Sequence, residues 1–189
     1  MRLMWSCLFI LLAGLVCSTK CLATIYYLDQ KVGPGEATGF IQTDGALGVL
    51  SSGNITNWNI LLNDGNTTFD LLGYSNSQIL VIGNGLTATS TNLFFDFSGA
   101  NSTVTQFQNP ALGSGINFLC FDGPLGGCSG SRDVALGTTG PHLSVPETGN
   151  LAIASTTPPV VAMEPASVTI FGIGLLAVGI LRRRSPRWN

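Results

Sequence analysis

The chain has 189 residues, of which 45% are hydrophobic and only 10% are charged, well below the quarter that is usual in soluble domains. Its length allows one domain plus targeting segments. Between residues 24 and 161, nine acidic residues stand against two basic ones, so this part has a net charge near −7. Such an acidic body excludes nucleic acid as a partner, because binding phosphates requires clustered lysine and arginine side chains.

The first 23 residues have the pattern of a secretory signal peptide. Arg2 supplies a positive start, and the apolar stretch 3–16 has the length of a signal core but is too short to span a bilayer. The small residue Ala23 predicts cleavage after it. Lipid attachment at Cys17 is the alternative, but Val16 stands where a lipoprotein signal has a small residue. We therefore expect residues 1–23 to be removed on export.

Residues 24–140 predict an all-β domain. Short runs of β-branched, aromatic and aliphatic residues are separated by Gly, Asn and Asp, and no window shows a helical period. The expected strands are residues 24–29, 37–43, 47–51, 55–62, 67–72, 78–82, 86–97, 103–108, 116–121 and 132–136. Strands of this number and spacing predict an antiparallel sandwich or jelly-roll.

Few residues of this body indicate catalysis or metal binding. The segment 63–66 predicts a hairpin turn and not a calcium loop, because it lacks the alternating carboxylates and the distal glutamate of an EF-hand. The single histidine, His142, lies in a stretch rich in Pro and Thr, where the base of a Ser-His-Asp site would not be held rigidly. Carboxylates could still pair in space as a glycosidase requires, so a hydrolase is kept as one hypothesis for the body. We expect a protein that is not an enzyme and needs no cofactor or metal.

Cys120 and Cys128 are the cysteines that remain after removal of the signal peptide, and they enclose a Gly-rich loop. An even pair in an oxidising compartment predicts a disulfide. A metal or redox site with two cysteines is the alternative, but no histidine or second cysteine pair lies nearby to complete a metal shell.

Residues 141–162 predict a linker that holds the β domain off the membrane. Four prolines stiffen this stretch, while Ser, Thr and Gly keep it soluble. Within it, Val145–Gly149 resembles a Gram-positive sortase motif. Such a motif normally adjoins its membrane segment, whereas here 16 residues separate Gly149 from Ala166.

Residues 163–189 contain three parts in a fixed order. Met163-Glu164-Pro165 comes first, the apolar run 168–181 follows, and a basic cluster ends the chain. The cluster consists of Arg182, Arg183, Arg184 and Arg187. As a helix, the apolar run is about 21 Å long. It can serve as a short membrane span, because bilayers thin locally and arginine side chains reach the interface. The arginines predict that this end lies in the cytoplasm and the body outside the inner membrane.

This tail resembles a PEP-CTERM sorting segment, in which Pro-Glu-Pro precedes a short transmembrane helix and a basic end. Glu164 and Pro165 match that pattern, and Met163 stands where the first proline is expected. The resemblance covers the last 27 residues and the signal peptide that export requires. It implies an exported Gram-negative bacterial protein that an exosortase-type enzyme recognises at the inner membrane. Such proteins reach the cell surface or an extracellular matrix and are often associated with polysaccharide. A plain single-pass anchor is the alternative use of the same residues.

A carbohydrate-binding module held at the cell surface is a further hypothesis for the body. β-Sandwiches commonly present aromatic rings to sugars, and four residues are available: Tyr26, Tyr27, Trp58 and Tyr74. The alternative is that these rings fill the core, where aromatic residues of strands usually lie.

Overall fold

The computed structural model describes residues 22–99, 102–124, 130–137 and 142–159. These residues are nearly all β, as the sequence predicted, with thirteen strands and two single-turn 3-10 helices among them. In chain order the strands are β1 (Thr24–Val32), β2 (Gly35–Thr43), β3 (Gly48–Val49), β4 (Ile55–Asn63), β5 (Thr68–Leu72), β6 (Gln78–Ile82), β7 (Leu86–Ala88), β8 (Asn92–Asp96), β9 (Val104–Gln108), β10 (Phe118–Asp122), β11 (Ser131–Ala135), β12 (His142–Pro146) and β13 (Asn150–Ser155). The 3-10 helices are η1 (Ser52–Asn54) and η2 (Gly73–Ser75).

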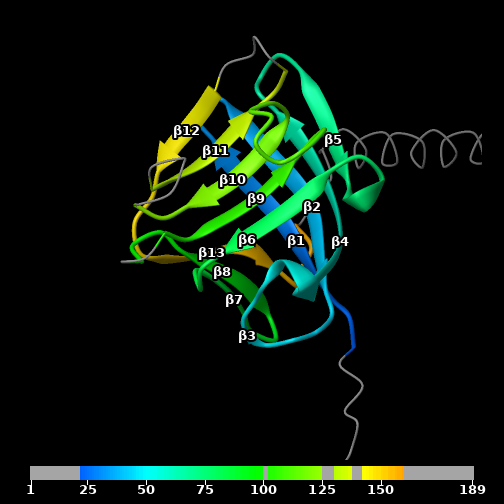
Figure 1. The fold of residues 1–189 in the computed structure, drawn as a ribbon, viewed down its shortest axis with the longest axis vertical. Coiled ribbons are helices and arrows are strands. Elements are labelled where there is room, and N and C mark those ends of the chain that lie inside the picture. Colours follow the sequence, from blue (N-terminus) through cyan, green and yellow to red (C-terminus); the bar gives the residue numbers. More distant parts are fainter. Residues whose placement is uncertain (1–21, 100–101, 125–129, 138–141, 160–189) are drawn as a thin grey trace, which may run out of the picture. The chain divides into compact units, whose positions relative to one another are not determined.

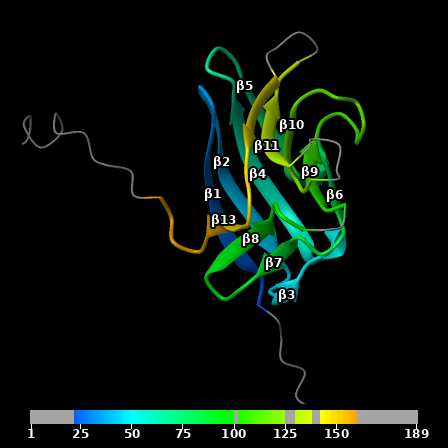
Figure 2. The ribbon, with the colours of Figure 1, turned by 90° about the vertical axis from the view of Figure 1, so that its left-hand side faces the viewer.

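The strands form two antiparallel sheets. The eight-stranded sheet has the order β3-β7-β8-β13-β1-β2-β4-β5, and the five-stranded sheet has the order β12-β11-β10-β9-β6. Figures 1 and 2 show the five-stranded sheet lying over the β1, β2 and β4 part of the larger sheet. The predicted antiparallel two-sheet architecture is therefore confirmed for this part of the chain.

The hydrophobic core lies between the two sheets and follows the period of two that strands impose. On β4, Trp58, Ile60 and Leu62 are buried, while Asn57 and Asn59 point to solvent. The five-stranded sheet adds buried rings from β9 and β10. One of these, Phe107, packs edge-on against Trp58 with 5.4 Å between ring centroids. Alternation in the sequence thus identified the buried face of the long strands correctly.

Gly39 allows β2 and β4 to lie close together in the middle of the large sheet. Its φ is +135°, a conformation that favours glycine. A Cβ at this position would lie 2.0 Å from the carbonyl oxygen of Asn59. A side chain on Gly39 would therefore clash with backbone that has no room to move.

The predicted linker over residues 141–162 is wrong for most of its length, because this stretch supplies strands to both sheets. β12 pairs with β11, and β13 lies between β8 and β1. Leu143 and Val145 pack against the core, and Ile153 is buried within it. The sortase-like segment is also part of the fold, because Glu147 pairs with Arg132 and the carbonyl of Gly149 accepts a hydrogen bond from the Phe97 N–H.

The predicted strand over residues 86–97 is two strands joined by a tight turn. The N–H of Thr89 donates to the carbonyl of Asn92 at 2.8 Å. The hydroxyl oxygen of Thr89 accepts from the Asn92 N–H at 3.0 Å. These bonds reverse the chain, so that β7 and β8 pair with each other.

Several predicted segments lie outside the described residues. They include the signal peptide up to residue 21, Cys128, the motif Met163-Glu164-Pro165, the apolar run 168–181 and the arginine cluster. Over the ranges that are described, no helix is long and apolar enough to cross a membrane.

Candidate ligand-binding face

Two of the four aromatic residues considered for sugar binding are part of the core. Tyr26 is fully buried, and its hydroxyl donates to the carbonyl of Thr89 at 2.7 Å. Burial raises the pKa of this phenol. Trp58 is 1% exposed, and its Nε1 donates to the hydroxyl of Ser77 at 3.0 Å. Neither ring can form a binding platform, so this part of the prediction is wrong; Tyr27 and Tyr74 remain accessible.

Tyr27 belongs to a row of side chains that crosses the outer face of the eight-stranded sheet. It stands opposite Phe40 of β2, which stands opposite Asn59 of β4, which in turn stands opposite Leu72 of β5. Ser155 of β13 extends the row on the other side of Tyr27. We call these five residues the outward row. Phe40 and Tyr27 are partly exposed, and Leu72 is 44% exposed, so apolar side chains lie open on this face on both sides of the polar Asn59.

Polar side chains border the outward row on both sides. Gln42 and Asn57 are cross-strand neighbours on one side, where the exposed Ile25 of β1 stands opposite Gln42. Asp29, Thr38 and Asp70 project from the same face on the other side, together with the partly exposed Leu61. The face therefore combines flat apolar rings with amide, hydroxyl and carboxylate groups.

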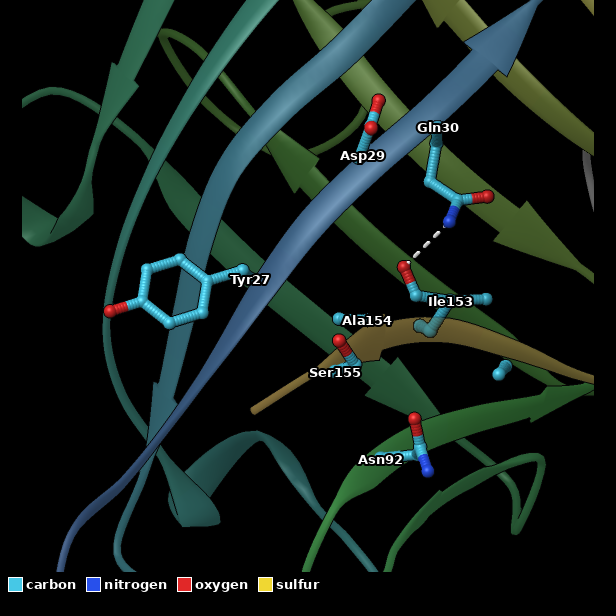
Figure 3. A pocket seen from close by; sticks show the side chains of 8 residues that line it. Tyr27, Asp29, Gln30, Asn92, Ile153, Ala154 and Ser155 are labelled. Atoms are coloured by element: carbon cyan, nitrogen blue, oxygen red, sulfur yellow. Dashed lines mark hydrogen bonds between the residues drawn. The ribbon is translucent and has the colours of Figure 1, made fainter. Parts of the chain in front are cut away.

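A shallow hollow adjoins the outward row where β1 and β13 separate. The two strands pair only at Tyr27–Ser155 and Leu28–Ala154, and β13 is irregular between Ala152 and Ala154. Beyond this point, Gln30 Nε2 bridges the gap by donating to the carbonyl of Ile153 at 2.8 Å (Figure 3). The hollow has a volume of about 160 Å³, and its lining also includes Tyr27, Asp29 and Asn92.

The charge on this face is negative. Lys31, the only base on these strands, forms an ion pair with Glu36 of the neighbouring strand. That hydrogen bond and the attraction between the two charges raise the pKa of Lys31 and lower the pKa of Glu36. Asp29 and Asp70 add two carboxylates, so acidic side chains outnumber the single base on this face.

The structure places His142 on the edge strand β12, beside Asp133 of β11. His142 Nε2 lies 3.9 Å from Asp133 Oδ2, and the Ser131 hydroxyl donates to the same oxygen at 2.9 Å. The aspartate thus stands between the serine and the histidine, whereas a hydrolase triad requires the histidine between the serine and the aspartate. Asp133 is also buried, as is Asp122 on the same face of the five-stranded sheet. These carboxylates are closed to a polysaccharide substrate.

The segment 63–66 forms the predicted hairpin turn between β4 and β5. The Asp64 carboxylate accepts hydrogen bonds from the N–H groups of Asn66 and Thr67. Nowhere in the described ranges do three or more His, Cys, Asp or Glu side chains gather in a way that could hold a metal ion.

The remaining predicted site residues are not brought together. Ala23 is exposed and directly precedes β1, and Cys120 is buried in β10. The proposed partner of Cys120, Cys128, lies outside the described residues, as do the sorting motif and the arginines, so these predictions stay open.

Phe40 was not among the predicted site residues, although its position can be predicted from the sequence. A two-residue turn at Gly33-Pro34 sets the register of β1 and β2, and counting back from it places Phe40 opposite Tyr27. Comparison of the chain with protein-family models, with curated proteins and with solved structures gives no match.

Proposed function

We propose that the chain is an exported bacterial surface or extracellular-matrix protein whose tail is recognised by an exosortase-type enzyme. The observation that carries this proposal is the order of the tail: Met163-Glu164-Pro165, the apolar run 168–181 and the arginine cluster. The signal peptide supplies the export route, and the acidic body suits an extracytoplasmic protein that does not bind nucleic acid.

The site of recognition would be Glu164 and Pro165, with the arginine cluster holding the C-terminal end in the cytoplasm. Only residues 156–162 lie between the end of β13 and Met163. Fully extended, this connection reaches about 25 Å at most. The sorting motif therefore begins only a short stretch of sequence after the last strand of the body.

Replacing Glu164 and Pro165 by alanine in the full chain tests the proposal. In a bacterium that encodes an exosortase, we expect the wild-type protein to lose mass at its C-terminus and to leave the inner membrane. The double variant should keep its full tail and stay in the membrane fraction. Pro159→Ala, a proline substitution outside the motif, is the matched control and should be processed normally.

Two results would count against this role. Processing of the double variant at the wild-type rate would remove Glu164 and Pro165 from recognition. Retention of the complete tail by the wild-type protein would indicate a plain single-pass anchor.

A further inference from the structure

We propose that the outer face of β1, β2, β4 and β5 binds an uncharged polysaccharide chain, with the rings of Tyr27 and Phe40 stacking against its sugar units. The proposal rests on the proposed function only in placing the body outside the cell. Its physical basis is the outward row and the polar side chains that border it.

The outward row offers the two kinds of contact that a sugar chain needs. Sugar rings have apolar C–H faces, which pack against the flat, electron-rich face of an aromatic ring. Tyr27 and Phe40 are direct cross-strand neighbours on adjacent strands, so their rings can serve consecutive units. The row crosses five strands, which at the usual strand spacing makes it about 19 Å long. A chain of several sugars can therefore lie across the sheet.

The bordering side chains can bond the hydroxyl groups of such a chain. Gln42 and Asn57 carry amides, which both donate and accept, while Thr38 adds a hydroxyl and Asp29 an acceptor. At the β13 end, the hollow brings Asn92 and Gln30 within the same region as Tyr27 (Figure 3). A volume of about 160 Å³ is too small to enclose a whole ligand, but it admits a protruding group of a sugar.

The charge of the face selects among possible ligands. Asp29 and Asp70 are negative, and the single base, Lys31, is already paired with Glu36. A polyanion such as a uronic-acid polymer or an anionic membrane would meet repulsion here, in an already acidic body. An uncharged glycan needs no counter-charge. It needs only rings for stacking and polar side chains for hydrogen bonds, and this face supplies both.

Affinity electrophoresis of the purified full-length chain in a neutral detergent tests the proposal. The gels contain an unbranched glucan, a xylan, a mannan, the polyanion alginate or the polycation chitosan. We expect at least one of the three neutral polymers to retard the protein and alginate to have no effect. Tyr27→Ala and Phe40→Ala should each weaken the retarding interaction about tenfold, whereas Tyr27→Phe keeps the ring and should bind like the wild type.

Tyr74→Ala is the matched control, because the exposed ring of Tyr74 packs edge-on against the buried Trp58 and not beside the outward row, which leaves it outside the proposed binding face. It should keep wild-type binding, and a thermal melt of every variant checks that the fold is intact. Failure of all three neutral polymers to bind, binding to a charged polymer alone, or an equal loss in Tyr74→Ala would overturn the proposal. None of these results depends on tail processing, which is read from mass and location.

Discussion

The Asp64 carboxylate stabilises the turn between β4 and β5 by accepting hydrogen bonds from the chain around it. The N–H of Asn66 lies 2.8 Å from Oδ1 and the N–H of Thr67 lies 2.7 Å from it. The Thr67 hydroxyl donates to Oδ2 at 3.1 Å. These bonds favour the ionised form and hold the pKa of Asp64 below its ordinary value of 3.8.

This shift predicts a specific dependence of stability on pH. A group whose pKa is lower in the folded state stabilises the fold above its unfolded pKa and loses that effect as pH falls through the folded value. We expect wild type to exceed Asp64→Asn in free energy of unfolding by a constant amount above about pH 4, and the gap to close below it. Urea denaturation at a series of pH values measures the gap.

Thr68→Ala in the same hairpin is the control, because it changes no titratable group. Its difference from wild type should stay the same across the pH series. A gap for Asp64→Asn that persists unchanged at pH 2 would contradict the account.

At the scale of elements, Arg132 ties the β11–β12 hairpin to the opposite sheet. Its Nη1 donates to the carbonyl of Lys31 in β1 at 3.0 Å, and its Nη2 pairs with Glu147 just after β12. The two side chains are only 13% and 19% exposed. Desolvation lowers the pKa of Arg132, and the charge of Glu147 opposes that effect.

Glu147→Gln should therefore destabilise the fold by about 1–3 kcal/mol, because it leaves a largely buried guanidinium without its counter-charge. Glu36→Gln, which breaks a more exposed ion pair with Lys31, should cost less than Glu147→Gln, because solvent screens the attraction between these two charges. Urea denaturation of both variants at neutral pH provides the comparison. An equal loss in free energy of unfolding for both variants would show that the burial of Arg132 does not strengthen its ion pair with Glu147.

The sequence predicted the long strands well, because their composition and alternation agree. The buried face of β4 follows from the alternation of Trp58, Ile60 and Leu62 alone. The missed strands β12 and β13 also alternate, through Leu143 and Val145 and then Leu151 and Ile153. Nearby prolines and small residues matched a linker pattern more strongly than this weak alternation matched strands. These segments are strands because β12 pairs with β11, and β13 pairs with β1 and β8.

At the scale of the molecule, the candidate face could not be predicted from the sequence, because strands that are distant in the sequence build it. The positions of Tyr27 and Phe40 follow from one local hairpin, but the neighbours of that pair come from distant strands. On the β13 side, Tyr27 stands opposite Ser155, which lies near the C-terminal end of the body. No local pattern encodes such a pairing, so Ser155 and the hollow could not be anticipated.

The place of β13 between β8 and β1 predicts the minimal folding unit. A chain of residues 24–158 should unfold cooperatively on heating. A chain of residues 24–140 lacks β12 and β13, leaves β1 and β8 without their shared neighbour and exposes the core beneath them. We expect the shorter chain to show no cooperative transition in circular dichroism. A sharp melt for it would restore the interpretation of residues 141–162 as a linker.

The pairing of β1 with β13 joins the first and last strands of the body, so the large sheet can close only after the last strand is available. For a chain that crosses a membrane N-terminus first, β1 emerges early but cannot complete its sheet until Ser155 has crossed. Contacts so distant in sequence form late, and until then hydrophobic strands stay open to proteases and to aggregation. On the proposed function, the tail would by that stage be entering the bilayer, so closure of the sandwich and arrival of the tail would coincide.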